Sequence, residues 1–339
     1  MSTIPARAAA PNWQLKQPFG WRSIAILLIV LTAAGLSAQR MQLDRMLVEI
    51  GHFVLDVTGQ AETSQVGRGI ESVTGDMFPI AIAERRPVDL IEGFDETALP
   101  VWSRLETVTV ETTELDPDTL QMTTISSERR FLVEPVGYLV FVLGKMLETI
   151  EIAIWASLIA IGLSLPLAWL ASENHSPHPV AYVIARAFVS MLRSIPELIS
   201  ALFLVLAFGF GPIAGILALT FHSIGFLGKF YAEDIEAANK SPQNALRATG
   251  AGTFTILRLA VLPQILPSYT GLSLYILDRN IRMATVIGLV GAGGIGQEMK
   301  GRFDMFQYDR VGTILLVIFL TVVALDMISA RVRKRLVEV

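Results

Sequence analysis

The chain contains no cysteine among its 339 residues, and only 17% of its residues are charged. The absence of thiols excludes disulfides and thiolate metal sites, so any segment outside the cytoplasm must fold on its own core. No phosphate-binding loop ending in Gly-Lys-Ser/Thr is present, which excludes ATP hydrolysis by this chain itself. His175 and His178 share a loop but have no further ligands nearby in sequence, so no metal site is expected.

Apolar residues are abundant instead. They make up 52% of the chain, and the mean hydropathy is +0.53, which indicates an all-α membrane protein with several spans. A span needs about 20 residues, and six apolar runs are long enough. The predicted spans cover residues 21–38, 138–171, 181–208, 212–231, 262–290 and 311–328. Kinks are expected at Pro166 and Pro196, because proline removes a helical hydrogen bond and its ring clashes with the preceding turn.

Basic residues flank both ends of this set of spans. They are Arg7, Lys16 and Arg22 before the first span, and Arg331, Arg333, Lys334 and Arg335 after the last. Because cytoplasmic flanks are enriched in Lys and Arg, both ends are predicted to lie inside. Residues 1–38 then form the cytoplasmic N-terminus and first span, residues 39–137 lie outside, and residues 138–339 form the main membrane domain with a cytoplasmic loop at 232–261. The first span could instead be a cleaved signal peptide, but it lacks a clean small-x-small site, which favours an uncleaved anchor.

The external segment contains one stretch typical of strands. Residues 104–128 alternate small polar and β-branched side chains around Asp116-Pro117-Asp118, which predicts a small external β-hairpin with its turn there. Two interpretations remain open for this insertion. It is either a small cap lying on the membrane domain or a docking platform for an external partner.

A short polar helix is predicted within the cytoplasmic loop. Ser241 is expected to cap it, Pro242 to occupy its first position, and Gly250 to end it in a left-handed turn. A second short helix, over residues 253–260, then leads to Pro263.

This stretch resembles the cytoplasmic coupling loop of ABC importer permeases. That family carries a Glu-Ala-Ala triplet, a glycine four residues after the last alanine, and a Leu-Pro further on. Gly250 and Leu262-Pro263 set the register, so the triplet falls on Asn244-Ala245-Leu246, and asparagine replaces the family's acid. Glu236-Ala237-Ala238 is excluded because Pro242 stands where glycine is needed. The resemblance implies contact with an ATPase subunit through Asn244, Ala245, Leu246, Arg247, Gly250, Ala251 and Pro263.

A glycine-rich segment follows the fifth predicted span. Gly291, Gly293 and Gly296 satisfy the dinucleotide pattern G-x-G-x-x-G, but that site needs a strand before the glycines and a βαβ unit around them. A membrane span precedes these glycines instead. The segment, which also includes Gly294, is therefore interpreted as a backbone-permissive gate loop closing the external end of the spans.

Residues 278–298, which include this loop, resemble the corresponding stretch of phosphonate ABC permeases, as does Leu192-Arg-Ser-Ile-Pro-Glu-Leu198. The resemblance covers roughly residues 146–335 and implies the MetI-like transmembrane domain of the type I importer permease fold. It also implies a multi-pass protein of the bacterial inner membrane that takes up phosphonates or related phosphorus oxyanions by alternating access. The implied partners are ATPase subunits that bind the ATP, a second identical or different permease, an external substrate-binding protein and the lipid bilayer. No nucleic acid and no cofactor of the chain's own are implied.

Charged residues inside predicted spans mark candidate parts of the substrate path, because an unpaired charge there costs several kcal/mol. Arg282, with Asn280 and Thr285 nearby, is the leading candidate for an oxyanion, since a guanidinium matches its fork of oxygens. Asp278 precedes Arg282 by four residues, so the two also fit a purely structural pair.

Ser194 and Glu197 flank Pro196 and are further candidates for the substrate path, although a pair between Arg193 and Glu197 that locks the kink is the simpler interpretation. Other functions remain possible from the sequence. They are a permease for phosphate, phosphite or methionine, a passive channel, and a membrane receptor or scaffold that moves no solute.

Overall fold

The computed structural model describes residues 20–58, 64–96, 99–100, 102–115 and 122–337. The chain divides into two compact units, Met1–Gly75 and Asp76–Val339. In the first unit, α1 Trp21–Arg40 is followed by α2 Leu43–Val57 and by α3 Gln65–Met77, which extends just past the boundary. The turn from α1 into α2 is made at Gln42, whose φ of 53° is left-handed.

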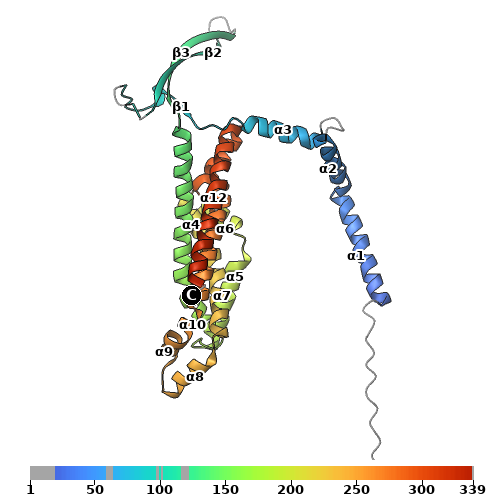
Figure 1. The fold of residues 1–339 in the computed structure, drawn as a ribbon, viewed down its shortest axis with the longest axis vertical. Helices are drawn as coiled ribbons and strands as arrows, with labels where there is room; N and C mark the ends of the chain where they lie inside the picture. The colour runs from blue at the N-terminus through green and yellow to red at the C-terminus, as the bar shows by residue number, and fades with distance from the viewer. Residues whose placement is uncertain (1–19, 59–63, 97–98, 101, 116–121, 338–339) are drawn as a thin grey trace, which may run out of the picture. The chain divides into compact units, whose positions relative to one another are not determined.

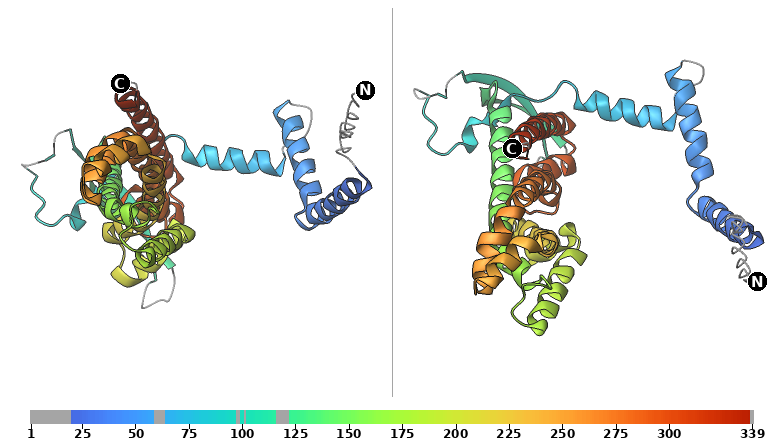
Figure 2. Two further views of the ribbon diagram at one scale, coloured as in Figure 1. Left: turned by 90° about the horizontal axis from the view of Figure 1, so that it is seen from below. Right: turned by 60° about the horizontal axis from the view of Figure 1, so that its bottom comes forward.

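Long helices form the body of the second unit (Figure 1). They are α4 Gly137–Leu170, α7 Pro212–Ala237, α10 Leu262–Gly288 and α12 Tyr308–Val337. Figure 2, left, looks along these helices. Small residues such as Ala153, Ala156 and Ala218 are fully buried where α4 packs against α7. Small side chains let helix backbones approach closely, which is the main packing device within a membrane.

The third predicted span is broken in two. α5 Pro179–Ser194 and α6 Glu197–Phe208 meet at an angle of 89°. Ile195 and Pro196 between them have extended backbone, so the helix ends before the proline rather than bending through it. The location of the predicted kink is confirmed, but the break is larger than a kink. Among the described residues, five helices are long and apolar enough to cross a membrane, and the bent pair would make a sixth.

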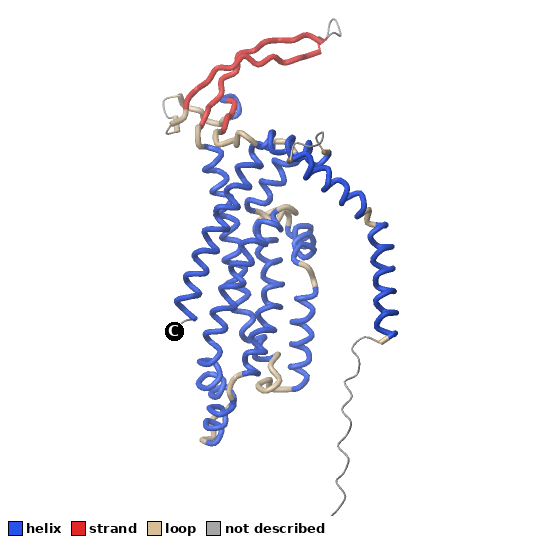
Figure 3. The backbone as a smooth tube through the Cα atoms, turned by 45° about the vertical axis from the view of Figure 1, so that its right-hand side comes forward, coloured by secondary structure: helices blue, strands red, loops and turns tan. Residues whose placement is uncertain are grey.

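A three-stranded antiparallel sheet lies at one end of this unit (Figure 3). β2 Arg104–Leu115 pairs with β3 Met122–Glu134, which confirms the hairpin, with Leu115 opposite Met122. The predicted turn at Asp116, Pro117 and Asp118 lies outside the described residues. A third strand, β1 Glu84–Pro87, was not predicted and pairs with the other edge of β3.

The segment before β1 is attached to the long helices. The Thr313 hydroxyl of α12 donates to the Ala81 carbonyl at 2.6 Å, and the Ala81 amide donates to the Asp309 carbonyl at 3.2 Å. The Leu139 amide of α4 donates to the Ile82 carbonyl. The sheet therefore continues from a segment fixed to the ends of α4 and α12. Both interpretations of the insertion, a cap or a docking platform, remain compatible with this attachment.

The predicted cytoplasmic loop lies at the opposite end of the long helices from the sheet (Figure 1). It contains α8 Lys240–Ala248 and α9 Thr253–Ile256, and a π-helical turn, η2 Leu257–Val261, joins α9 to α10. The predicted cap was wrong in detail. Asn239 caps α8 by accepting from the Ser241 amide at 2.9 Å, so the helix begins two residues before Pro242.

Candidate functional site

A cluster of ionisable side chains lies beside the break between α5 and α6. Glu197, the first residue of α6, forms an ion pair with Arg279 of α10. The Nε2 atom of His222, from the middle of α7, lies 3.3 Å from the same carboxylate oxygen and 3.1 Å from Arg279 Nη2. The predicted pairing of Glu197 with Arg193 was wrong, because the break turns Glu197 away from the helix that carries Arg193.

The second acid–base pair lies within α10. Arg282 Nη2 contacts Asp278 Oδ2 at 2.6 Å, as the four-residue spacing predicts. The carboxylate side chain is only 8% exposed, whereas the arginine side chain is 46% exposed. Asp278 thus holds the inner end of the pair, and the guanidinium extends toward the surface of the unit. The pairing is confirmed, and a role for Arg282 in binding a substrate stays a prediction.

Asn280 and Thr285 do not join that pair. Asn280 is 1% exposed, and its Nδ2 donates to Ser157 Oγ of α4 at 2.9 Å and to Ser223 Oγ of α7 at 3.0 Å. Two residues along a helix turn the side chain by about 200°, so Asn280 points away from Arg282. The Thr285 hydroxyl donates to the Arg282 carbonyl within its own helix. Asn280 therefore joins three helices inside the core, a contact that its position in sequence does not reveal.

Ser194, the last of the residues predicted for the substrate path, lies at the end of α5. Its hydroxyl donates to the Met191 carbonyl at 2.8 Å and is exposed. It is close in sequence to Glu197, but its own hydrogen bond satisfies the end of α5. The structure thus brings together Asp278 with Arg282, and Glu197 with Arg279.

The loop of α8 and α9 presents one face to solvent and holds the other against the helices. Asn244, Ala245, Arg247 and Pro263 are exposed, while Leu246 and Ala251 are half-buried. Gly250 has a φ of 81°, and the Ala251 amide donates back to the Leu246 carbonyl at 3.2 Å, so the left-handed turn is confirmed.

Residues that the sequence did not single out fix this loop. Gln243 is buried and donates to the Ala238 and Asn239 carbonyls, while the Asn239 amide donates to Gln264 Oε1 of α10 at 3.0 Å. On the outer side, Phe254 is 68% exposed and Leu259 is 60% exposed. Large apolar side chains exposed at a loop are typical of a surface that another protein or the membrane covers.

His175 lies in the loop between α4 and α5 and is buried. Burial lowers the pKa of His175, and the positive charge of Arg247 on α8 lowers it further. The imidazole is therefore neutral near pH 7.

The glycine loop between α10 and α11 Gly294–Asp304 is held by two neighbouring elements. The Gly211 amide donates to the Gly291 carbonyl at 3.0 Å, and the Gly294 amide donates to Glu148 Oε1 of α4 at 3.0 Å. Gly291, Gly293 and Gly294 have φ values of 94°, 87° and 70°, which side chains rarely adopt. A helix precedes the loop, as predicted, in place of the strand that a dinucleotide site needs. Its role as an external gate stays a prediction.

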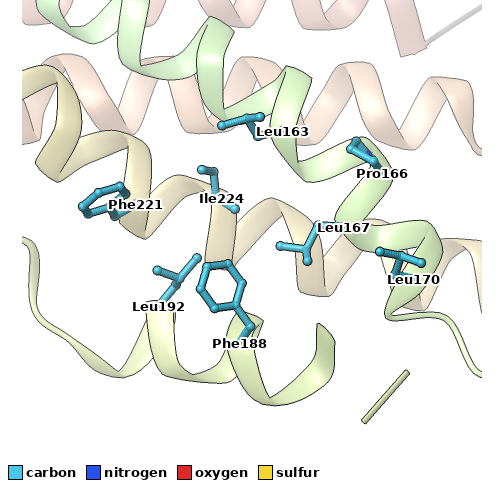
Figure 4. A pocket seen from close by; sticks show the side chains of 8 residues that line it. All are labelled: Leu163, Pro166, Leu167, Leu170, Phe188, Leu192, Phe221 and Ile224. Atoms are coloured by element: carbon cyan, nitrogen blue, oxygen red, sulfur yellow. The ribbon is translucent and has the colours of Figure 1, made fainter. Parts of the chain in front are cut away.

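An apolar pocket of about 540 Å³ lies between α4, α5 and α7 (Figure 4). Leu163, Phe188 and Phe221 point into it, and all eight lining residues carry apolar side chains. An anion would lose its hydration there without gaining a hydrogen bond. The pocket is therefore not a candidate for an oxyanion site. The polar clusters on α10 are the candidates instead.

Comparison with known proteins places this architecture in a family. Residues 160–338 match the family described as binding-protein-dependent transport system inner membrane component. The chain is 52% identical, over 261 residues, to a putative phosphite transport system permease protein of Stutzerimonas stutzeri, covering 77% of this chain and all of that one. It is 44% identical over 190 residues to a phosphate-import permease protein of Mycolicibacterium smegmatis, covering 56% of this chain and 36% of that one.

Solved structures support the same fold at lower identity. The permease of a methionine ABC transporter in an inward-facing conformation aligns with a TM-score of 0.51 and 21% identity, covering 58% of this chain and 96% of that one. An amino acid ABC transporter crystallised with histidines aligns with a TM-score of 0.50 and 16% identity, covering 59% and 96%. The fold is therefore that of type I ABC importer permeases. The chain is a multi-pass transport subunit of the inner membrane, and it belongs to the family of binding-protein-dependent transport system inner membrane components.

Proposed function

We propose that this chain is the permease of an ABC importer for phosphite, phosphonates or phosphate. The observation that carries the proposal is the 52% identity over 261 residues to a protein named for phosphite transport. The arginines of α10 suit such a cargo, because a guanidinium presents a planar fork of donors to a tetrahedral oxyanion.

The substrate path runs beside the middle of α10. Arg282 is the group that meets the anion, since its side chain is exposed while the buried Asp278 anchors it. Glu197 and Ser194 line the break between α5 and α6, where the helix is interrupted within the membrane domain. Interrupted helices in transporters are typical of substrate sites, because only backbone that lines a cavity tolerates such a break. Asn280 and Thr285 support this path from α10 without facing Arg282.

ATP hydrolysis by partner subunits drives transport, and these subunits act at the end of the long helices opposite the sheet. ATPase subunits bind the ATP and dock on the exposed face of α8 and α9, with Phe254 and Leu259 as apolar anchors and Arg247 as a charged contact. α8 lies between α7 and α10 in the chain, so a pull on α8 acts on α7 and on α10, the helix that carries Arg282. A second permease completes the path, and an external binding protein delivers the anion.

The proposal is tested by reconstituting the full transporter in vesicles and measuring ATP hydrolysis and uptake. Phosphite, methylphosphonate, phosphate and methionine are compared, each with the cognate binding protein. At least one phosphorus anion should stimulate both hydrolysis and uptake, and methionine should stimulate neither. Stimulation by methionine alone would overturn the substrate class. Uptake without ATP would identify a passive channel, and binding of a partner without uptake would identify a receptor.

A further inference from the structure

The ion pair between Glu197 and Arg279 differs from the pair within α10. Asp278 and Arg282 belong to one helix and need no other element to meet. Glu197 begins α6 directly after the break, whereas Arg279 lies 82 residues later on α10. The Glu197–Arg279 pair therefore depends on how the broken segment lies against α10.

The guanidinium of Arg279 is only partly used in this cluster. Its Nη2 atom contacts Glu197 and His222. Its Nη1 atom is buried and has no hydrogen-bond partner among the described residues. A buried donor that is left unpaired costs stability, and an unrecorded ligand is one of the few physical explanations for it. The group thus has donor capacity for a further acceptor.

His222 offers Glu197 a second partner. Its Nε2 atom is 3.3 Å from the Glu197 carboxylate oxygen that also pairs with Arg279. While Arg279 Nη2 donates to His222 Nε2, that nitrogen is an acceptor and carries no proton. Once the guanidinium turns away, the tautomer with a proton on Nε2 donates to the Glu197 oxygen. Glu197 therefore gains a hydrogen bond from His222 when the guanidinium turns to another acceptor.

We propose that Arg279 is a second anion-receiving group of the transport path, masked by Glu197 in this state, and that the entering oxyanion displaces Glu197, which stays with His222. The proposal rests on the proposed function, since the ligand is the transported anion. No covalent bond forms or breaks. The hydrogen bond from Arg279 to Glu197 is replaced by one from Arg279 to the anion, and both are charge-assisted. Masking keeps the arginine from holding the anion permanently, which a transporter must avoid.

The test measures equilibrium binding of inorganic phosphate and of phosphite to the purified permease–ATPase complex, without the binding protein. Glu197→Gln removes the competing charge, so anion affinity should rise about tenfold. In the double variant Glu197→Gln with Arg279→Gln, the gain should disappear. Glu236→Gln is the matched control, because it breaks another partly buried carboxylate–guanidinium pair, with Arg186 at 2.7 Å, near the C-terminal end of α7. Arg186 Nε is also buried without a partner among the described residues, so the control tests whether an unpaired donor alone is enough for anion binding. The anion affinity of Glu236→Gln should equal that of the wild type.

A purely structural role predicts a different result. Glu197→Gln would then lower the thermal unfolding temperature without raising anion affinity, and that result overturns the proposal, as does a gain that survives in the double variant. If Glu197→Gln does not fold, Glu197→Asp retains the charge at a greater distance from Arg279 and should give a smaller gain, and no gain again overturns the proposal. A wild-type transporter that moves no phosphorus anion overturns the proposed function itself. Unchanged affinity in a variant of a working phosphite importer overturns only this inference.

Discussion

At the scale of single residues, the two arginines of α10 occupy different electrostatic positions. Arg282 has its own carboxylate on the same helix, and Asp278 is nearly buried. Removing Arg282 alone would leave the nearly buried Asp278 carboxylate without its partner and would lower the stability of the fold. Loss of uptake in Arg282→Gln would therefore be ambiguous between a lost ligand and a misfolded protein.

The double variant Asp278→Asn with Arg282→Gln resolves this ambiguity. It removes both charges at nearly constant volume, so its unfolding free energy should stay within about 1 kcal/mol of the wild type. Uptake of the phosphorus anion should nevertheless fall at least about tenfold, because a neutral amide does not replace a charge-assisted fork. Thermal unfolding in detergent checks the predicted stability, and uptake in vesicles checks the predicted loss of transport. Near-normal uptake in the folded double variant would show that the pair is only structural.

Gly250 gives a second prediction at this scale, because its φ of 81° is a conformation in which a β-branched residue is strained by about 1–2 kcal/mol. No atom lies within 4 Å of a Cβ added there, so the strain is in the backbone alone. Gly250→Val should therefore distort the turn after α8 and reduce coupled ATP hydrolysis and uptake, while membrane insertion is unchanged. Asn tolerates this conformation, so Gly250→Asn is the control and should be close to the wild type. Equal activity in both variants would argue against contact of this turn with the ATPase.

Residue partners were predictable from sequence only where one helix supplies both. The spacing of Asp278 and Arg282 was sufficient, since residues four apart on a continuous helix are neighbours. The same spacing failed for Arg193 and Glu197, because the helix breaks between them. Asn280 and Ser157 are 123 residues apart, so their contact follows from helix packing that no local pattern encodes.

At the scale of elements, the crossing of α10 and α11 depends on two glycines in contact. A Cβ added to Gly296 would lie 2.1 Å from the Thr285 carbonyl oxygen and 2.9 Å from Gly288 Cα. Both are backbone atoms and cannot rotate away. The two helices can approach this closely only without side chains at the crossing.

The variant Gly296→Ala should therefore force α11 away from α10 and lower both the yield of folded protein and its unfolding temperature. Gly301→Ala on the same helix is the matched control, since no atom lies within 4 Å of its added Cβ. Alanine is the better helix former, so the control should be neutral or more stable by up to about 1 kcal/mol. The measurement is the thermal unfolding temperature of both variants in the same detergent. Equal stability would mean that the crossing is loose.

The sequence predicted long elements better than short ones. Apolar runs of about 20 residues leave few alternatives to a membrane helix. β1 was missed because Glu-Arg-Arg-Pro has no alternating pattern, and it is a strand only because β3 offers a free edge. The π-helical turn before α10 was missed as well. It allows a residue without an amide hydrogen, Pro263, to stand one position into the next helix.

At the scale of the whole molecule, the apolar composition correctly indicated a membrane protein with several spans. The basic residues that flank the spans also predict its orientation in the membrane. The sheet and the loop of α8 and α9 lie at opposite ends of the long helices in the second unit (Figure 3). An importer needs that separation, because the binding protein and the ATPase act on opposite faces of the membrane. The positive flanks predict that the sheet lies outside and α8 inside.

The absence of cysteine makes this orientation directly testable, because a single introduced thiol is the only one in the chain. Ser126→Cys places it on an exposed position of β3, and Ser241→Cys places it on an exposed position of α8. In intact cells, a membrane-impermeant maleimide should label the first variant and spare the second. In inside-out vesicles that carry the permease alone, the pattern should reverse, since each vesicle exposes the former cytoplasmic face. Labelling at both positions in intact cells would point to leaky membranes. Labelling of Ser241→Cys alone would invert the orientation and place the α8 face beyond the reach of any cytoplasmic ATPase.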